Sequence, residues 1–319
     1  MKELDKKDMK LLLELDVNAR ATLTNLGKKL RLSKQSVDYR IKKLEKLGLI
    51  KGYYSTINFS KLGFVAYRLA LKFRNFGIEE EKKLFNYCKS IKKIGWLFSI
   101  NGRWDVVITI YARDIIEFDK ISQKIIYKYG EKILENNIST IVSIYNYPNK
   151  FLSKEKINFV IAKDKIETIT IDKLDEKILK SLSMDARISL INLSDKIKSN
   201  PRTIRYRINR LEKLGIIQNY RAKINTNKLG YDHYKIFLNL QKMTEEKMTS
   251  LLGYFKSQKN VIYATRAIGL ADLEFEVKIK TPEGLYQIVN NLRNQFKNQI
   301  KSWDSVLIRE EKMINYCPF

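Results

Sequence analysis

The chain has 319 residues and a formal net charge of +26, because 61 Lys and Arg outnumber 35 Asp and Glu. It has no apolar run of membrane-spanning length, no apolar core of a signal peptide near its start, and only two cysteines without metal-site spacing. These features exclude a membrane-spanning or disulfide-rich secreted class, and we expect a cytoplasmic chain with no cofactor, no metal and an anionic partner such as nucleic acid.

A duplication organises the sequence. Residues 4–63 recur without a gap at residues 171–230, and Asp5 corresponds to Asp172, an offset of 172 − 5 = 167. The segment YRIKKLEKLGLI, from Tyr39 to Ile50, is matched by YRINRLEKLGII. A repeated module in a basic chain predicts two-point contact with a linear polyanion, although a merely solvated basic surface also accounts for the charge.

Each copy opens with two predicted amphipathic helices. Asp5 can cap the first, and Asp8 suits the positive end of its dipole. Thr22 can cap the second, and Gly27 in its middle predicts that a neighbouring helix crosses closely. The counterparts in the second copy are Asp172, Asp175, Ser189 and Ser194.

A tight turn and a basic third helix follow. Ser33 can cap this helix, which is predicted to run to about Leu47, where Gly48 terminates it. In the second copy the cap, first helical residue and terminator are Asn200, Pro201 and Gly215. Two helices joined by such a turn are typical of a helix-turn-helix, and the β-prone stretches ending at Ile57 and Ile224 predict a wing.

One side of the third helix is predicted to read DNA. Val37, Ile41 and Leu44 share a sector that must face the core, so the N-terminal part of the opposite sector would enter the major groove. The predicted base-edge readers are Gln35, Asp38, Tyr39, Arg202, Arg205 and Tyr206, and Lys42 and Asn209 share their sector. For any one of them, contact with phosphate or water alone remains an alternative.

Further residues of this helix are predicted to contact the DNA backbone. They are Ser36 and Thr203 at the sector margin, and the cations Lys34, Lys43 and Arg210. Arg40 and Arg207 lie nearer the core, where they either brace the domain or reach a phosphate. Because Arg205 replaces Asp38 in the second copy, we expect the two heads to prefer different half-sites.

An α+β region is predicted after each head, with the ferredoxin-like order βαββαβ. Asn101-Gly102 predicts a turn between its second and third strands, which are expected at Trp96 to Ile100 and Val106 to Tyr111. Both copies carry Gly-x-x-Asp there, Gly102 to Asp105 and Gly269 to Asp272, which serves either a structural turn or a ligand. Since the open sheet face needs covering, we expect a homo-oligomer or an intramolecular pseudo-dimer.

The predicted domains therefore alternate along the chain. Winged helix-turn-helix domains cover residues 1–58 and 171–225, and the α+β domains cover residues 59–147 and 226–319. Residues 148–170 form the predicted linker, with a short strand from Ile157 to Ile161.

The pattern resembles the Lrp/AsnC, or feast/famine, family of transcriptional regulators in tandem duplication. The resemblance is carried by RI-x-x-LE-x-x-G-[LI]-I at Arg40 to Ile50 and Arg207 to Ile217, and by the Leu-Gly at Leu62-Gly63 and Leu229-Gly230. It implies a double-stranded DNA-binding regulator whose βαββαβ, or RAM, domains pair through their sheets. It further implies an amino-acid effector near Gly102, Asp105, Gly269 and Asp272.

Two other functions compete with this one. Fused siroheme decarboxylases resemble the same family, but their His-rich stretch is replaced here by VIYATR, and His233 is the single histidine. Since no nucleophile–base pair or metal-ligand cluster is visible, we expect no enzyme. A non-specific architectural protein would share the heads and charge, whereas a regulator should prefer its site by about a thousandfold or more.

Overall fold

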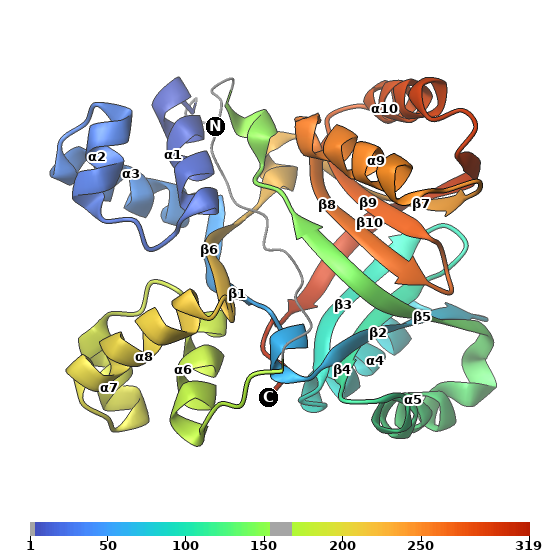
Figure 1. The fold of residues 1–319 in the computed structure, drawn as a ribbon, viewed down its shortest axis with the longest axis horizontal. Coiled ribbons are helices and arrows are strands. Elements are labelled where there is room, and N and C mark those ends of the chain that lie inside the picture. The colour runs from blue at the N-terminus through green and yellow to red at the C-terminus, as the bar shows by residue number, and fades with distance from the viewer. Residues whose placement is uncertain (1–3, 154–167) are drawn as a thin grey trace. The chain divides into compact units, whose positions relative to one another are not determined.

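The computed structural model describes residues 4–153 and 168–319, so the predicted strand from Ile157 to Ile161 lies outside the described residues. The helices and strands of the first copy recur in the second at the offset of 167, as in α1 (Lys6–Val17) and α6 (Lys173–Met184). They group into two compact units, each containing like parts of both copies (Figure 1). The head unit comprises Met1–Leu62 and Tyr147–Leu229, and the barrel unit comprises Gly63–Asn146 and Gly230–Phe319.

The head unit contains two copies of a three-helix motif. Helix α1 is followed by α2 (Leu23–Leu30) and α3 (Lys34–Lys46), and α6 by α7 (Leu190–Ile197) and α8 (Pro201–Lys213). The predicted caps are confirmed at every helix, since side chains of Asp5, Thr22, Ser33, Asp172, Ser189 and Asn200 accept hydrogen bonds from backbone N–H groups of the first turn. The terminators are confirmed too, with φ of +64° at Gly48 and +65° at Gly215.

The small residue in the second helix serves the turn, not a helix crossing, which corrects our prediction. A Cβ on Gly27 would lie 2.6 Å from the carbonyl oxygen of Leu32, and the Leu32 N–H donates to the Gly27 carbonyl at 2.9 Å. In the second copy, the Ser194 hydroxyl donates to the Ser199 carbonyl at 2.6 Å. The turn folds back onto the helix so closely that only a small side chain fits.

The strand predicted after each third helix is present, but it does not fold back on itself within its own copy. β1 (Ile50–Ile57) pairs antiparallel with β6 (Ile217–Ile224) of the other copy, with Tyr54 opposite Arg221. Figure 1 shows this two-stranded sheet between the helices of the two heads. The wing is therefore shared, and it joins the heads into one unit.

The barrel unit consists of two βαββαβ modules. The first contains β2 (Val65–Phe73), α4 (Ile78–Ser90), β3 (Ile94–Asn101), β4 (Val106–Ala112), α5 (Ile115–Tyr129) and β5 (Ile133–Asn146). The second contains β7 (Asp232–Leu240), α9 (Glu245–Ser257), β8 (Val261–Ile268), β9 (Leu273–Ile279), α10 (Pro282–Gln295) and β10 (Ile300–Ile314). The ferredoxin-like α+β class is thereby confirmed.

The two modules close into one eight-stranded barrel. The strand order is β10-β3-β4-β2-β5-β8-β9-β7, and β7 pairs with β10 to complete the ring. Each module's last strand crosses to the other module, since β5 pairs with β8 and β10 with β3. The sheets thus pair within one chain, which is the pseudo-dimer alternative of our prediction.

The central strand β4 of the first module is buried on both faces. In β4, Val106, Ile108 and Ile110 belong to the core beneath α4 and α5, whereas Val107 belongs to a second core filled from both modules. The largest side chains of that second core are aromatic, with Phe98 and Trp104 from one module and Phe237 from the other. The alternation follows from the period of two along a strand.

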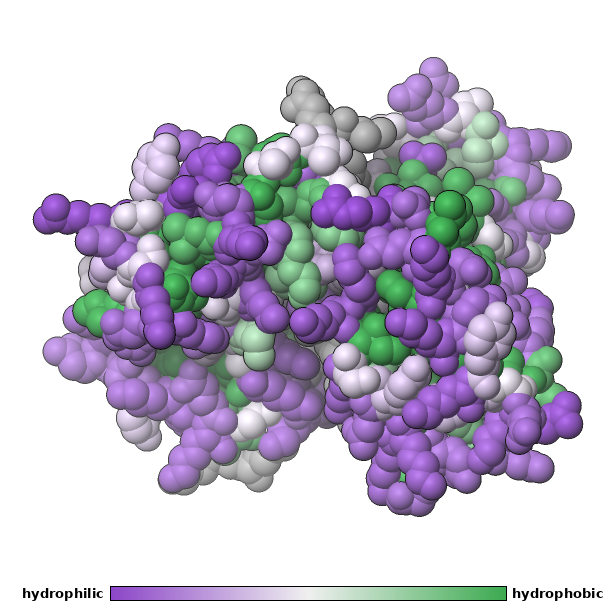
Figure 2. Space-filling model, turned by 90° about the horizontal axis from the view of Figure 1, so that it is seen from below, coloured by the Kyte–Doolittle hydropathy of each residue, from purple (hydrophilic) through white to green (hydrophobic). Residues whose placement is uncertain are grey.

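The outer surface is mainly polar. In Figure 2, hydrophilic residues cover most of the visible face and hydrophobic residues form small separate patches. Within residues 4–153 and 168–319, none of the helices is long and apolar enough to cross a bilayer.

Candidate nucleic-acid interface and pocket

The third helices bury one face and expose the other, as predicted. Val37, Ile41 and Leu44 are buried in α3, and Ile204, Ile208 and Leu211 are buried in α8. Tyr39 and Tyr206 are 69% and 67% exposed. Lys34, Gln35, Lys42, Arg202, Thr203, Arg205 and Asn209 are also exposed, and Ser36 and Asp38 are half-buried. Each helix thus presents a polar stripe near its N-terminal end, where a major-groove reader needs it.

Arginines nearer the core brace each third helix against the first helix. Arg40 forms ion pairs with Asp8 at 2.6 Å and Asp5 at 2.8 Å, and Lys43 pairs with Asp8 at 2.9 Å. In the second copy, Arg207 and Arg210 pair with the matching carboxylates of Asp172 and Asp175. The backbone N–H of Asp175 and the guanidinium of Arg207 lower the pKa of the Asp172 carboxyl. Of the two roles predicted for Arg40 and Arg207, bracing is the one seen in the structure.

The two heads differ in the charge of their exposed stripes. In α3, Lys42 and Asp38 form an ion pair at 2.7 Å, and the hydrogen bond to Asp38 raises the pKa of Lys42. The carboxylate of the first head thus already has a donor. Their counterparts in α8 are Asn209 and Arg205, and within the described residues Arg205 has no ion pair of this kind. The second head therefore offers the more accessible cations to a phosphate or a guanine.

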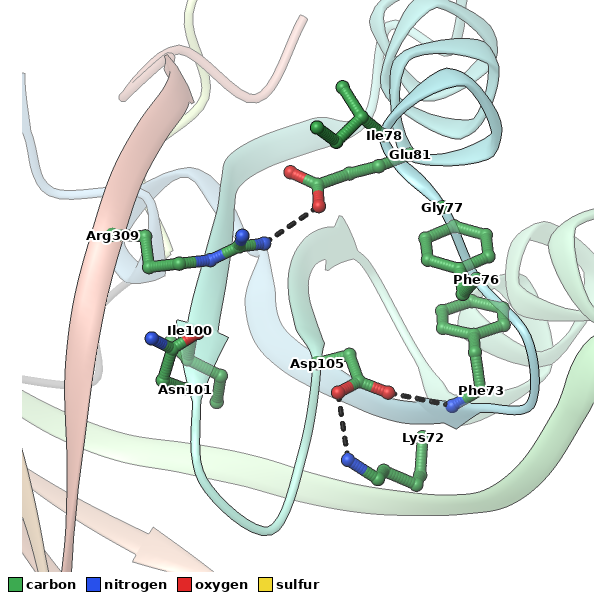
Figure 3. Close-up of a pocket in the computed structure, with 10 residues that line it drawn as sticks. All are labelled: Lys72, Phe73, Phe76, Gly77, Ile78, Glu81, Ile100, Asn101, Asp105 and Arg309. Carbon is green, nitrogen blue, oxygen red and sulfur yellow. Dashed lines mark hydrogen bonds and ion pairs between the residues drawn. The ribbon is translucent and has the colours of Figure 1, made fainter.

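A pocket of about 310 Å³ lies where the first Gly-x-x-Asp ends. Figure 3 shows its lining from two modules, with Phe73, Phe76 and Glu81 from one and Arg309 from β10 of the other. Arg309 and Glu81 pair at 2.7 Å, and the rings of Phe73 and Phe76 stack with centroids 3.9 Å apart. Sequence reasoning missed Arg309 and Glu81, because the module pairing that joins them has no local signal.

The Gly-x-x-Asp motif has a structural role in both copies. Asp105 accepts from the Phe73 backbone N–H and from Lys72 Nζ, each at 2.8 Å, and Asp272 accepts from the Leu240 N–H at 2.7 Å. The turn predicted at Asn101-Gly102 is confirmed, since the connection between β3 and β4 spans residues 102 to 105. Gly102 and Gly269 have φ of +154° and +119°, and added Cβ atoms would lie 2.6 Å from Val306 and 2.4 Å from the Ile138 carbonyl oxygen.

Of the predicted effector residues Gly102, Asp105, Gly269 and Asp272, only Asp105 lines the described pocket. The residues around Asp105 are not repeated in the second copy. At the offset of 167, Lys72, Glu81 and Arg309 correspond to Asn239, Met248 and Val142. The charged lining therefore belongs to one side of the barrel.

Known proteins match both heads and the fold. Residues 4–45 match the AsnC-type helix-turn-helix domain, and residues 171–218 match a winged helix-turn-helix DNA-binding domain. An uncharacterised HTH-type transcriptional regulator of Pyrococcus furiosus is 32% identical over 126 residues, which is 39% of this chain and 81% of the relative. The HTH-type transcriptional regulator Ptr1 of Methanocaldococcus jannaschii is 33% identical over 125 residues, 39% of this chain and 82% of that protein.

Among solved structures, the siroheme decarboxylase NirDL matches nearly the whole chain. Its TM-score is 0.63 with 9% identity, covering 98% of this chain and 93% of that one. At this identity the likeness extends to the fold alone. The heads, their repeated caps and these relatives establish that the chain belongs to the Lrp/AsnC family of helix-turn-helix transcriptional regulators.

Proposed function

We propose that the protein regulates transcription by placing α3 and α8 in major grooves of one double-stranded DNA site. The observation that carries the proposal is the exposed polar stripe on each third helix, held outward by the buried Val37 and Ile204 faces. Base edges would be read by Gln35, Asp38 and Tyr39 in one head. In the other head they would be read by Arg202, Arg205 and Tyr206.

The heads are unequal, so the preferred site should have two different halves. Selection of binding sequences from a random pool, followed by competition against random DNA, tests this directly. A regulator should favour its site by about a thousandfold or more, whereas an architectural coat binds both pools alike. Recovery of two identical half-sites would contradict the unequal heads while leaving DNA binding intact.

We further propose that the pocket beside Asp105 binds a small zwitterionic effector such as an amino acid. Its 310 Å³ lies at the lower end of volumes that hold small ligands. Arg309 can bind a carboxylate and Glu81 an ammonium group once their mutual ion pair opens, while Phe73 and Phe76 offer an apolar wall.

Calorimetric titration of the twenty amino acids into the whole protein tests the effector. Arg309→Met should abolish the binding that the natural protein shows, and Val142→Met, at the matching place of the other module, should not. Binding that survives Arg309→Met would place the effector elsewhere. DNA affinity measured with and without the bound amino acid then reports whether it regulates.

A further inference from the structure

Two kinds of contact join the two heads. Most are reciprocal, meaning that each contact from the first head to the second has an equivalent contact from the second head to the first. The Ala19 N–H donates to the Tyr220 carbonyl at 2.8 Å, and the Ala186 N–H donates to the Tyr53 carbonyl at 3.0 Å. Arg20 donates to the Ala186 carbonyl and Arg187 donates to the Ala19 carbonyl, at 2.7 and 2.6 Å. Since each residue type recurs in both copies, these contacts would equally join two first heads or two second heads.

One buried ion pair between the heads occurs in a single direction. Arg221 of β6 donates from Nε and Nη2 to the two carboxylate oxygens of Asp16 in α1, both at 2.9 Å. Asp16 is 2% exposed, and Asn149 donates to it as well, at 2.7 Å from its backbone and 2.9 Å from its side chain. At the offset of 167, Asp16 corresponds to Ser183 and Arg221 to Tyr54. Two first heads would therefore bury carboxylates without an arginine, and two second heads would bury arginines without a carboxylate.

The barrel interior also contains buried ion pairs that have no equivalent in the reverse direction. Arg68 of β2 forms an ion pair with Glu274 of β9, across the barrel from one module to the other. Lys235 lies between two carboxylates, at 2.7 Å from Glu274 and 2.9 Å from Glu276, and His233 contacts Glu276 at 2.9 Å. All five side chains are buried. Two basic side chains and two carboxylates thus balance inside the barrel, apart from the histidine.

The balance depends on which modules meet. The first module places Ala66, Arg68, Val107 and Thr109 where the second places His233, Lys235, Glu274 and Glu276. Both carboxylates therefore come from the second module. Two first modules would face each other with arginines alone, and two second modules would bury twice as many carboxylates as lysines. Either arrangement leaves uncompensated charge in the interior.

We propose that the buried ion pairs of the head unit and of the barrel unit determine which copies can pair. A first copy then pairs stably with a second copy but not with another first copy. The partner that each surface fits is the other half of the same chain. Every assembled molecule then presents one α3 and one α8, and the unequal reading heads always act as a mixed pair. The inference concerns assembly and holds whether or not the heads bind the DNA sequence they prefer.

Charge complementation between two full-length chains tests the proposal. One chain carries Arg68→Glu and a cysteine reporter, Thr140→Cys, in its first module. The other carries Glu274→Lys and Ile268→Cys in its second module. Residues 140 and 268 lie opposite each other where β5 pairs with β8, so their disulfide reports that the two modules have paired. The natural cysteines, Cys88 and Cys317, are both buried.

Each altered chain is expected to close poorly on itself, with a melting temperature lowered by roughly 5 °C or more. Expressed together, the two chains should exchange modules. The carboxylate introduced by Arg68→Glu then meets the ammonium group introduced by Glu274→Lys, and the unaltered Arg68 of one chain meets the unaltered Glu274 of the other. The altered pair should form roughly tenfold more interchain disulfide than matched control chains that carry only the cysteine substitutions.

Two results would overturn the proposal. One is interchain disulfide at the control level from altered chains that fold by circular dichroism, and the other is failure to obtain soluble protein from the two chains even when they are expressed together. Chains that are soluble only in each other's presence would support it, since only the mixture restores balanced charge.

Discussion

At the scale of single residues, the two heads differ in charge at one exposed position and keep the same bracing arginine at another. Arg205 stands where the first head has a carboxylate that Lys42 already binds, so the second head brings an exposed guanidinium to the groove. Arg40 and Arg207 were assigned two roles from sequence, because helical periodicity places them at the edge of the buried sector without showing their partners. The structure supplies those partners as aspartates in the cap and first turn of the first helix.

We expect Arg205→Ala to weaken binding to the preferred sequence by ~1–3 kcal/mol, roughly fivefold to 150-fold, because a bidentate base contact is lost. Binding to random DNA should weaken less. Fluorescence anisotropy with both DNAs measures the difference, and Lys120→Ala in α5, an exposed cation of the barrel unit, serves as the control. Equal losses on the two DNAs would show that Arg205 contacts phosphate only.

Acid should weaken the barrel through Glu276. Burial by itself raises the pKa of this carboxyl, but the charge of Lys235 and the hydrogen bond from His233 hold it at about 2, below the ordinary 4.5. A carboxyl with a lowered pKa in the folded state stabilises fully above about pH 4.5, and this contribution is lost as pH falls toward 2. The free energy of unfolding should fall by an amount on the order of 3 kcal/mol through this carboxyl.

Urea unfolding between pH 7 and pH 2, followed by tryptophan fluorescence, measures this effect, since Trp96, Trp104 and Trp303 all lie in the barrel unit. Glu276→Gln should be less stable at neutral pH and show a shallower decline in acid. A variant with the same acid dependence as the natural protein would assign the decline to other carboxyls.

At the scale of secondary-structure elements, caps and terminators were predictable because they act within one turn of chain. Asp5 and Ser33 cap their helices, and Gly48 ends its helix, through contacts with residues only a few positions away. The role of Gly27 was not predictable in this way. A small residue in a helix indicates a close approach, but its position in the sequence does not say whether a helix or a turn approaches.

Alanine substitution at two helix glycines tests whether a close backbone approach makes glycine necessary. We expect Gly27→Ala to destabilise the protein by ~1–3 kcal/mol, because its Cβ would lie 2.6 Å from the Leu32 carbonyl oxygen. Gly253→Ala, in α9 where nothing lies within 4 Å of the new Cβ, should stabilise by ~0.5–1 kcal/mol. Urea unfolding followed by circular dichroism checks both, and a neutral Gly27→Ala would mean that the turn can move away.

At the scale of the whole molecule, the tandem copies exchange strands instead of folding as successive domains. β1 pairs with β6 in the head unit, and β5 and β10 each pair with a strand of the other module in the barrel unit. The five consecutive domain ranges derived from sequence remain a prediction, and the contacts divide the chain differently, by kind of module. The joining of both heads into one unit has a direct consequence for DNA.

Because β1–β6 pairing and the Asp16–Arg221 ion pair fix one head against the other, the spacing of half-sites should be fixed as well. Insertion of five base pairs, about half a helical turn, between the selected half-sites should lower affinity by roughly a hundredfold. Band-shift titration of the two DNAs measures this. Unchanged affinity would show that only one head engages at a time.

The sequence by itself determined the duplication, the helix-turn-helix of each head, the buried and exposed sides of α3 and α8, and the order of the βαββαβ modules. All of these follow from periodicity and from contacts between near neighbours, which a single stretch of chain contains. Only the tertiary structure decided that β1 pairs with β6, that Arg309 reaches Glu81, and that Arg68 meets Glu274. These contacts join residues far apart in the chain, and their geometry depends on how the two copies close on each other, so no local pattern specifies them.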